Sequence, residues 1–251
     1  MKGKVEVLAS TIVNHSIKVE KDEKVKIICE TMEPMPLVKA LVKLINEKGA
    51  CVSVSFFDSV LNAEVNMGTT DKKIDLLKEL EEFEVNKFDS FIRIFCNQGD
   101  YVNSIVPDEI TKKIGEALKE YRDIRANERK WVLLNYPSKV DSQKAKMSPD
   151  EFYDFSFDAM CYDYEQMSKD LEPLKALMEN TDKVRLTGDG TDISFSIKDI
   201  PAIPCAGEAN IPDGECYTAP VKDSINGVIK YNTPSPYRGN VFHGVTLTFE
   251  N

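Results

Sequence analysis

Glu215 is the residue of this chain whose type and local sequence point most directly to chemistry. It follows a turn-forming sequence in which Pro212 and Asp213 favour a turn and Gly214 can adopt the positive φ that the turn needs. The short apolar YTAP stretch after the glutamate predicts a restricted, partly dry place for the carboxylate. A buried carboxylate without a partner protonates or costs several kcal/mol. We therefore expect either a structural salt bridge or turn hydrogen bond at Glu215, or a bound cation.

Three aspartates form a second pattern, in the segment MSPDEFYDFSFDAMCYDYEQM. Ser148 and Glu151 make a capping box that begins a helix, and Asp150, Asp154 and Asp158 then lie one helical turn apart. Carboxylates at this spacing could share a metal, but a solvated acidic face favoured by the helix dipole is the simpler interpretation. The apolar face of this helix is expected to consist of Phe152, Phe155, Ala159 and Tyr162.

The thiols and imidazoles do not form an obvious catalytic pattern. The chain has six cysteines and two histidines, and no two cysteines have C-x-x-C spacing. Reduced, mostly buried thiols are therefore expected. A catalytic thiol would need a histidine, and the two available are His15 and His243.

Composition narrows the class of protein. The 251 residues are 42% hydrophobic and 29% charged, with a net charge of −10. The acidic balance argues against binding to nucleic acid or to anionic membranes. No segment approaches the roughly 18 apolar residues that span a bilayer, and the start lacks the apolar run of a secretory leader. We expect a cytoplasmic protein.

Strands and helices alternate in the first 136 residues. Apolar runs predict strands, and 3.6-residue periodicity predicts helices between them. The expected strands are Lys24–Glu30, Cys51–Phe57, Phe88–Cys96 and Lys130–Tyr136, and the expected helices begin at Pro36, Asp71 and Pro107. This order predicts a mostly parallel sheet, which often binds ligands beyond the carboxyl ends of its strands. The sequence CETMEPMP after the first strand contains no glycine, and no phosphate-binding loop occurs, so nucleotides are not expected.

Beyond Asn180 the periodicity changes to two, which is typical of antiparallel strands. Val184 and Leu186 alternate with charged residues, and Asp189-Gly190 is a hairpin turn signal. We therefore predict an α/β fold with two domains. Residues 1–179 would form a mostly parallel α/β domain that includes the acidic aromatic helix, and residues 180–251 would belong to a second domain rich in antiparallel strands.

The stretch IPAIPCAGEANIPDGECYTAPVKDSINGVIKYNTPSPYRG, residues 200–239, closely resembles the M29 family of metallo-aminopeptidases. That family carries an N-x-P-x-G-E sequence followed by T-A-P and by a serine and a glycine at fixed spacing. The segments RKWVLLNYPSKVDSQKAKMSPDEFYDF, TDKVRLTGDGTDISFSI and NHSIKVEKDEKVKIICETMEPMPLVKAL extend the resemblance over nearly the whole chain. The matching positions of the central motif are Asn210, Pro212, Gly214, Glu215, Tyr217, Thr218, Ala219, Pro220, Ser224, Asn226 and Gly227.

The resemblance implies a dimeric exopeptidase that acts on peptides with a free amino terminus. Two divalent cations (zinc, cobalt or manganese) would bind the amino end and the scissile carbonyl of the substrate and activate a bridging water. The glutamate of the family motif is a metal ligand, and it corresponds to Glu215.

The resemblance also implies ligands that have no counterpart here. In the family a second glutamate, two histidines, an aspartate and an active-site tyrosine follow the motif. His243 lies in RGNVFHGVTL, which is not the family's histidine motif. The resemblance therefore implies an amino-terminal portion of the enzyme, in which residues 180–251 are an incomplete catalytic domain. We expect it to lack a complete set of catalytic residues and to be inactive alone. The alternative is a naturally short, non-catalytic binding or interaction domain whose acidic aromatic helix contacts a partner.

Overall fold

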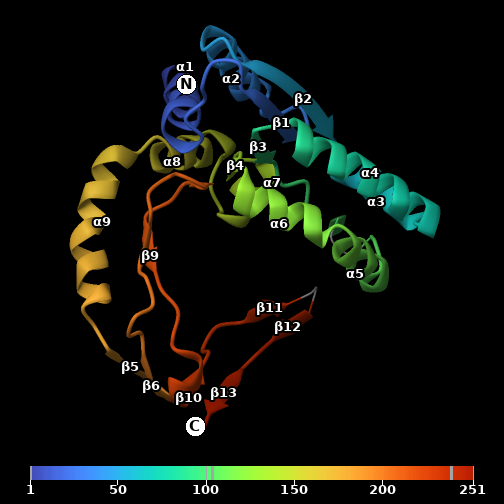
Figure 1. The fold of residues 1–251 in the computed structure, drawn as a ribbon. Coiled ribbons are helices and arrows are strands. Elements are labelled where there is room, and N and C mark those ends of the chain that lie inside the picture. The colour runs from blue at the N-terminus through green and yellow to red at the C-terminus, as the bar shows by residue number, and fades with distance from the viewer. Residues whose placement is uncertain (1, 100, 103–104, 238–239, 251) are drawn as a thin grey trace. The chain divides into compact units, whose positions relative to one another are not determined.

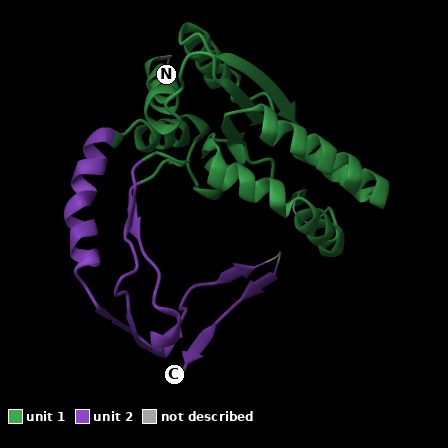
Figure 2. Cartoon of the chain, in the orientation of Figure 1, with its two compact units in different colours: residues 1–164, 207–213 green, residues 165–206, 214–251 purple. Residues whose placement is uncertain are grey.

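The structure is a computed structural model that describes residues 2–99, 101–102, 105–237 and 240–250 (Figure 1). Its residues group into two compact units (Figure 2). Unit 1 comprises residues 1–164 and 207–213, and unit 2 comprises residues 165–206 and 214–251. No helix in the described part of the chain combines the length and the apolar character needed to cross a bilayer.

Unit 1 is built on a parallel sheet with the strand order β2-β1-β3-β4-β8. The strands are β1 (Lys24–Glu30), β2 (Cys51–Phe57), β3 (Ser90–Phe95), β4 (Lys130–Asn135) and β8 (Asn210–Ile211). All four neighbouring pairs are parallel, which confirms the predicted sheet. The helical elements are α1 (Lys2–Thr11), the π-helical η1 (Ile12–Ser16), α2 (Met35–Glu47), α3 (Ser59–Met67), α4 (Asp71–Lys87), α5 (Asp108–Ala117), α6 (Lys119–Glu128), α7 (Lys139–Lys144) and α8 (Pro149–Met160).

One face of this sheet forms the main core. Ile27, Ile92 and Leu134 point to it from the three central strands and are fully buried. Helix α2 packs on β1 and β2, and η1 packs on β4. Leu37 and Leu41 of α2 are also fully buried. Since burial of a large aliphatic side chain contributes about 1.5–3 kcal/mol, this layer accounts for much of the stability of unit 1.

Helices α4 and α6 lie on the opposite face, near the amino ends of the strands. Lys26 of β1 is buried there, and its Nζ lies 2.8 Å from Glu84 Oε1 of α4. The guanidinium of Arg125 on α6 lies 4.9 Å from the centre of the Phe91 ring of β3. The same face continues toward the carboxyl ends of the strands, where Arg93 is exposed.

Two predicted helices of unit 1 differ in the structure. The single helix expected to begin at Pro107 divides into α5 and α6 at Leu118, whose φ of −100° and ψ of 7° are not helical. Helix α8 begins with the predicted capping box, but its expected apolar face is wrong. Phe155 is 62% exposed and Tyr162 is 51% exposed, whereas Phe157 is fully buried. Phe157 packs on Tyr136, directly after β4, with ring centres 5.8 Å apart, and stacks on Tyr153 of its own helix at 4.3 Å.

Unit 2 contains α9 (Tyr164–Glu179) from Glu165 onward, followed by antiparallel strands, as predicted for the later part of the chain. Its main sheet has the order β13-β10-β6-β5. Gly190, at φ 72°, closes the predicted hairpin between β5 and β6. The strands are β5 (Lys183–Gly188), β6 (Thr191–Ser196), β10 (Asn226–Lys230) and β13 (Thr246–Phe249), with the separate pairs β7 (Ile203–Cys205) with β9 (Glu215–Tyr217) and β11 (Ser235–Tyr237) with β12 (Asn240–Phe242), and with a 3-10 turn η3 (Lys222–Ser224).

The compact units do not divide at residue 180. Most of α9 belongs to unit 2, and residues 207–213 return to unit 1 because β8 forms a parallel pair with β4. The division into domains 1–179 and 180–251 stays a prediction about the complete fold.

Candidate functional site

The segment that precedes Glu215 is fixed within unit 1. Asp213 Oδ2 accepts a hydrogen bond of 2.9 Å from the Gly207 backbone N–H, and Ser16 Oγ donates to the Gly207 carbonyl at 2.5 Å. Gly207 has a φ of 82°, and a Cβ at this position would lie 2.7 Å from Cγ of Tyr164. Asp213 thus fills the turn hydrogen-bonding role that was one expectation for Glu215.

Glu215 itself begins β9 in unit 2. It pairs with Cys205 of β7 in an antiparallel ladder of three residue pairs. Gly214 before it has a φ of 138°, as the turn sequence predicted, and a Cβ there would lie 3.2 Å from Cε of Met167. The strand therefore starts from a backbone conformation that favours glycine.

The predicted partly dry setting of Glu215 is wrong, because the residue is exposed. Among the described strands, β9 pairs only with β7, in a sheet of two strands. So small a sheet covers little of the Glu215 side chain. In the described part of the chain, no salt bridge or side-chain hydrogen bond engages the Glu215 carboxylate. The structural alternatives raised by the sequence therefore have no support among these residues, and the carboxylate is open to an external ligand.

Glu215 does not by itself fit a metal site. No group of three or more histidine, cysteine, aspartate or glutamate side chains in the described residues could hold a metal ion. His243, which follows β12 and is exposed, belongs to no such group. A metal that catalyses hydrolysis usually has three protein ligands, and a bare carboxylate does not meet that requirement.

Two members of the aspartate stripe on α8 (Asp150, Asp154 and Asp158) form ion pairs with a lysine. Lys4 Nζ lies 3.2 Å from Asp154 Oδ1 and 2.7 Å from Asp158 Oδ1. The stripe is therefore an ion-pairing, solvated face, in agreement with the simpler interpretation of the sequence.

The cysteines are free thiols, and those in the core are poor nucleophiles. Burial raises the pKa of Cys29 and of Cys96 to about 12. The expectation that the thiols are mostly buried is wrong for Cys51, which is exposed at the start of the edge strand β2, and Cys161, Cys205 and Cys216 are half-buried. His15 stacks on the ring of Tyr164 at 6.0 Å, which gives it a packing role.

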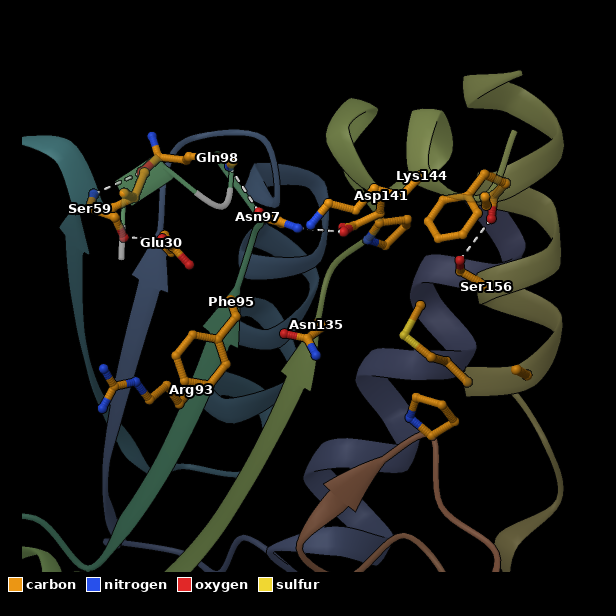
Figure 3. A pocket seen from close by; sticks show the side chains of 18 of the residues that line it. Glu30, Ser59, Arg93, Phe95, Asn97, Gln98, Asn135, Asp141, Lys144 and Ser156 are labelled. Carbon is orange, nitrogen blue, oxygen red and sulfur yellow. Dashed lines mark hydrogen bonds between the residues drawn. The ribbon is translucent and has the colours of Figure 1, made fainter. Parts of the chain in front are cut away.

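A cavity of about 860 Å³ lies in unit 1 at the carboxyl ends of the parallel strands (Figure 3). Its walls include Glu30 of β1, Phe57 of β2, Phe95 of β3 and Asn135 of β4. Helix α8 adds the side chains that the sequence assigned to an apolar face, namely Phe152, Phe155 and Ala159. The cavity lies where ligands bind in many parallel sheets.

Hydrogen bonds hold the polar wall of this cavity in place. Glu30 accepts from Ser59 Oγ and, at 3.0 Å, from the Cys96 backbone N–H. Asn97 Nδ2 donates to Asp141 Oδ1 at 2.7 Å (Figure 3). Sequence reasoning considered this edge only for nucleotides and missed these residues. The available signal was a polar residue directly after each apolar run, at Glu30, Asn97 and Asn135.

Comparisons with known proteins place the chain in a family. The family described as Thermophilic metalloprotease (M29) matches residues 1–251. Aminopeptidase 2 of Geobacillus stearothermophilus is 26% identical over 192 residues, which cover 64% of this chain and 46% of that protein. Aminopeptidase AmpS of Bacillus subtilis is 23% identical over 287 aligned positions, covering 99% of this chain and 68% of that protein. The aligned part of this chain thus spans less than half of the length of Aminopeptidase 2.

Solved structures agree on the fold. Wild-type AmpT from Thermus thermophilus superposes with a TM-score of 0.75 at 17% identity, over 99% of this chain and 69% of that one. The 2,5-dihydroxypyridine dioxygenase of Pseudomonas putida gives a TM-score of 0.54 at 12% identity, over 92% of this chain and 59% of that one. At these identities the structures support the fold alone. The match of the family to the whole sequence shows that the chain belongs to the M29 family of metalloproteases.

Proposed function

We propose that these 251 residues work as part of a metal-dependent aminopeptidase that removes amino-terminal residues from peptides. The observation that carries the proposal is the setting of Glu215, the position of the family's metal-binding glutamate. It is exposed and starts a strand directly after a glycine with positive φ. No described side chain engages its carboxylate, so it is available as a ligand.

Glu215 would supply one carboxylate of a site for two divalent cations, for which zinc, cobalt and manganese are suitable. The other ligands would come from residues that the 251-residue chain does not assemble, since its described part contains no cluster of three candidates. We therefore propose that the isolated chain is inactive and that unit 2 is an incomplete part of the catalytic domain. A cytoplasmic homodimer is the assembly proposed for the complete enzyme.

The test is Glu215→Gln in the complete enzyme, with hydrolysis of leucyl p-nitroanilide as the assay. Loss of a residue that orients a metal ligand already lowers metal affinity or activity about 10–100-fold. Loss of a ligand itself should therefore lower kcat/KM by at least about a hundredfold. The matched control is Glu179→Gln at the end of α9, an exposed glutamate in the same unit. Hydrolysis that survives in Glu215→Gln at the level of this control would rule out Glu215 as a ligand.

The isolated chain provides a second measurement. Calorimetric titration with zinc should show no tight, stoichiometric site, because a lone carboxylate binds divalent zinc weakly. Two tight sites in the 251-residue chain would contradict the proposal that its ligand set is incomplete.

A further inference from the structure

The cavity of unit 1 contains an arginine, Arg93, that forms no ion pair with a carboxylate among the described residues. Arg93 lies in β3, opposite Ile28 of β1 and Leu133 of β4. Its side chain shares a face with Phe95 because alternate residues of a strand point to the same side. Arg93 and Phe95 both line the cavity (Figure 3).

Two aromatic rings orient the guanidinium of Arg93. It lies 4.9 Å from the centre of the Phe95 ring and 5.9 Å from the centre of the Phe57 ring. A guanidinium stacked on an aromatic face keeps its N–H groups in the plane of the group, free to donate along its edge. The rings also supply an apolar surface next to a fixed positive charge.

The second arginine on this face of the sheet shows what Arg93 lacks. Arg125 lies over the Phe91 ring and is paired with Glu81 of α4. Among the described residues Arg93 has no such ion pair. Glu30, the carboxylate on the neighbouring strand, instead accepts hydrogen bonds from Ser59 and from the Cys96 N–H.

We propose that this cavity binds a small carboxylate with an apolar or aromatic body. The carboxylate would accept two hydrogen bonds from Arg93, since the guanidinium fork matches a carboxylate in geometry. The body would lie against Phe95 and the apolar side chains of α8. The amide of Asn135, which is exposed in the cavity wall, supplies a further donor.

The size and place of the cavity agree with this assignment. About 860 Å³ is within the range of small-molecule sites. The carboxyl edge of a parallel sheet is a common position for ligands, and the absence of a glycine-rich loop after β1 leaves side chains to recognise the anion. The proposal concerns unit 1 alone and does not depend on the metal-binding role of Glu215.

The experiment is a fluorine NMR titration of the 251-residue chain with 4-fluorobenzoate. The matched neutral probe is 4-fluorobenzamide, which has the same ring and lacks the charge. Because a hydrogen bond to a charged group contributes about 1.5–3 kcal/mol, the benzoate should bind at least about tenfold more tightly than the benzamide. Equal affinity of the two probes, or no saturable binding of the benzoate, overturns the proposal.

Variants locate the site. Arg93→Gln should weaken benzoate binding at least about tenfold, whereas Arg93→Lys, which keeps the charge but loses the fork, should weaken it less. Arg185→Gln is the control, since Arg185 is exposed and pairs with Asp192 in unit 2. Fluorescence of Trp131, the single tryptophan, verifies that unit 1 of each variant is folded. If Arg93→Gln does not fold, Arg93→Lys is compared with wild type. Weaker benzoate binding by Arg93→Lys then supports the proposal, and equal binding overturns it.

Inorganic phosphate distinguishes a carboxylate site from a general anion site. Phosphate has the charge but no apolar body, so it should displace 4-fluorobenzoate only at concentrations at least about tenfold higher. Displacement by phosphate at equal concentration, or unchanged benzoate binding by Arg93→Gln, would show that the rings and the guanidinium do not form the proposed site.

Discussion

Units 1 and 2 differ in how they are stabilised and in how they hold their polar groups. In unit 1 a parallel sheet buries a continuous apolar layer, and Glu30 in the cavity accepts two hydrogen bonds. In unit 2 the buried apolar side chains in the described residues are Ile193, Ile197, Ala202 and Ala206. Glu215 is exposed there and unengaged by described side chains. Unit 1 thus holds the polar wall of its cavity by its own hydrogen bonds, whereas the proposed metal ligand of unit 2 has no described side chain beside it to complete a site.

The largest expected effect is on the core of unit 1. Leu41→Ala removes a fully buried side chain of α2 and should lower the free energy of unfolding by about 2–5 kcal/mol. Leu247→Ala in unit 2 removes a side chain that is 44% exposed and should cost less than about 1 kcal/mol. Guanidinium denaturation followed by circular dichroism reports on both units, and Trp131 fluorescence isolates unit 1, because this tryptophan lies in β4. Equal shifts for the two variants would remove the distinction between the units.

The backbone of unit 2 should be more sensitive than its side chains. Gly227 of β10 has a φ of 116°, and a Cβ there would lie 2.1 Å from the Asp192 carbonyl oxygen in β6. Gly227→Ala should therefore destabilise this sheet by about 1–3 kcal/mol or more. Hydrogen exchange of the β6 amides gives the readout, and exchange as slow as in wild type would contradict the close approach. Gly3→Ala, at a position with open space, is the control.

Glu30 and Glu215 provide a comparison of two glutamates. Glu30→Ala leaves the buried Cys96 N–H without its acceptor and should cost about 1–3 kcal/mol of unfolding free energy. Glu215→Ala should change the stability of the chain by less than about 0.5 kcal/mol, since the side chain is exposed. Chemical denaturation of both variants measures the difference in unfolding free energy. Equal stability of Glu30→Ala and Glu215→Ala would contradict the structural role of Glu30.

The smallest effect concerns the thiols of unit 1. At pH 8 the exposed Cys51 should react with iodoacetamide well before Cys29 and Cys96, whose pKa values are raised to about 12 by burial. In the folded protein their alkylation should become faster as the pH approaches 12, because the thiolate fraction rises. Peptide mass spectrometry after timed labelling gives the order, and early modification of Cys29 would contradict its burial.

The sequence predicted the regular parts of both units well. The apolar runs of β1 and β2 and the hairpin at Gly190 are local signals, and each is confirmed by strand pairing. The capping box at Ser148 is equally local and is confirmed. Such features follow from a few adjacent residues, so single-sequence reasoning finds them.

Features that depend on tertiary contacts were missed. Helix α8 has aromatic residues on more than one side, and the packing of Phe157 on Tyr136 and Tyr153 decides which side is buried. The exposure of Glu215 follows from the short pairing of β9 with β7, which its neighbours in sequence do not reveal. Arg93 looked like an ordinary strand residue, and its cavity is lined by residues of four strands and of α8 together.

The metal content of the complete enzyme tests the central claim most directly. Wild type and Glu215→Gln would be loaded with zinc, freed of excess metal and measured by mass spectrometry, with Glu179→Gln as the control. We predict two ions bound per chain in wild type and in the control, and at least one fewer in Glu215→Gln. Equal zinc content in Glu215→Gln and wild type would contradict the assignment of Glu215 as a metal ligand.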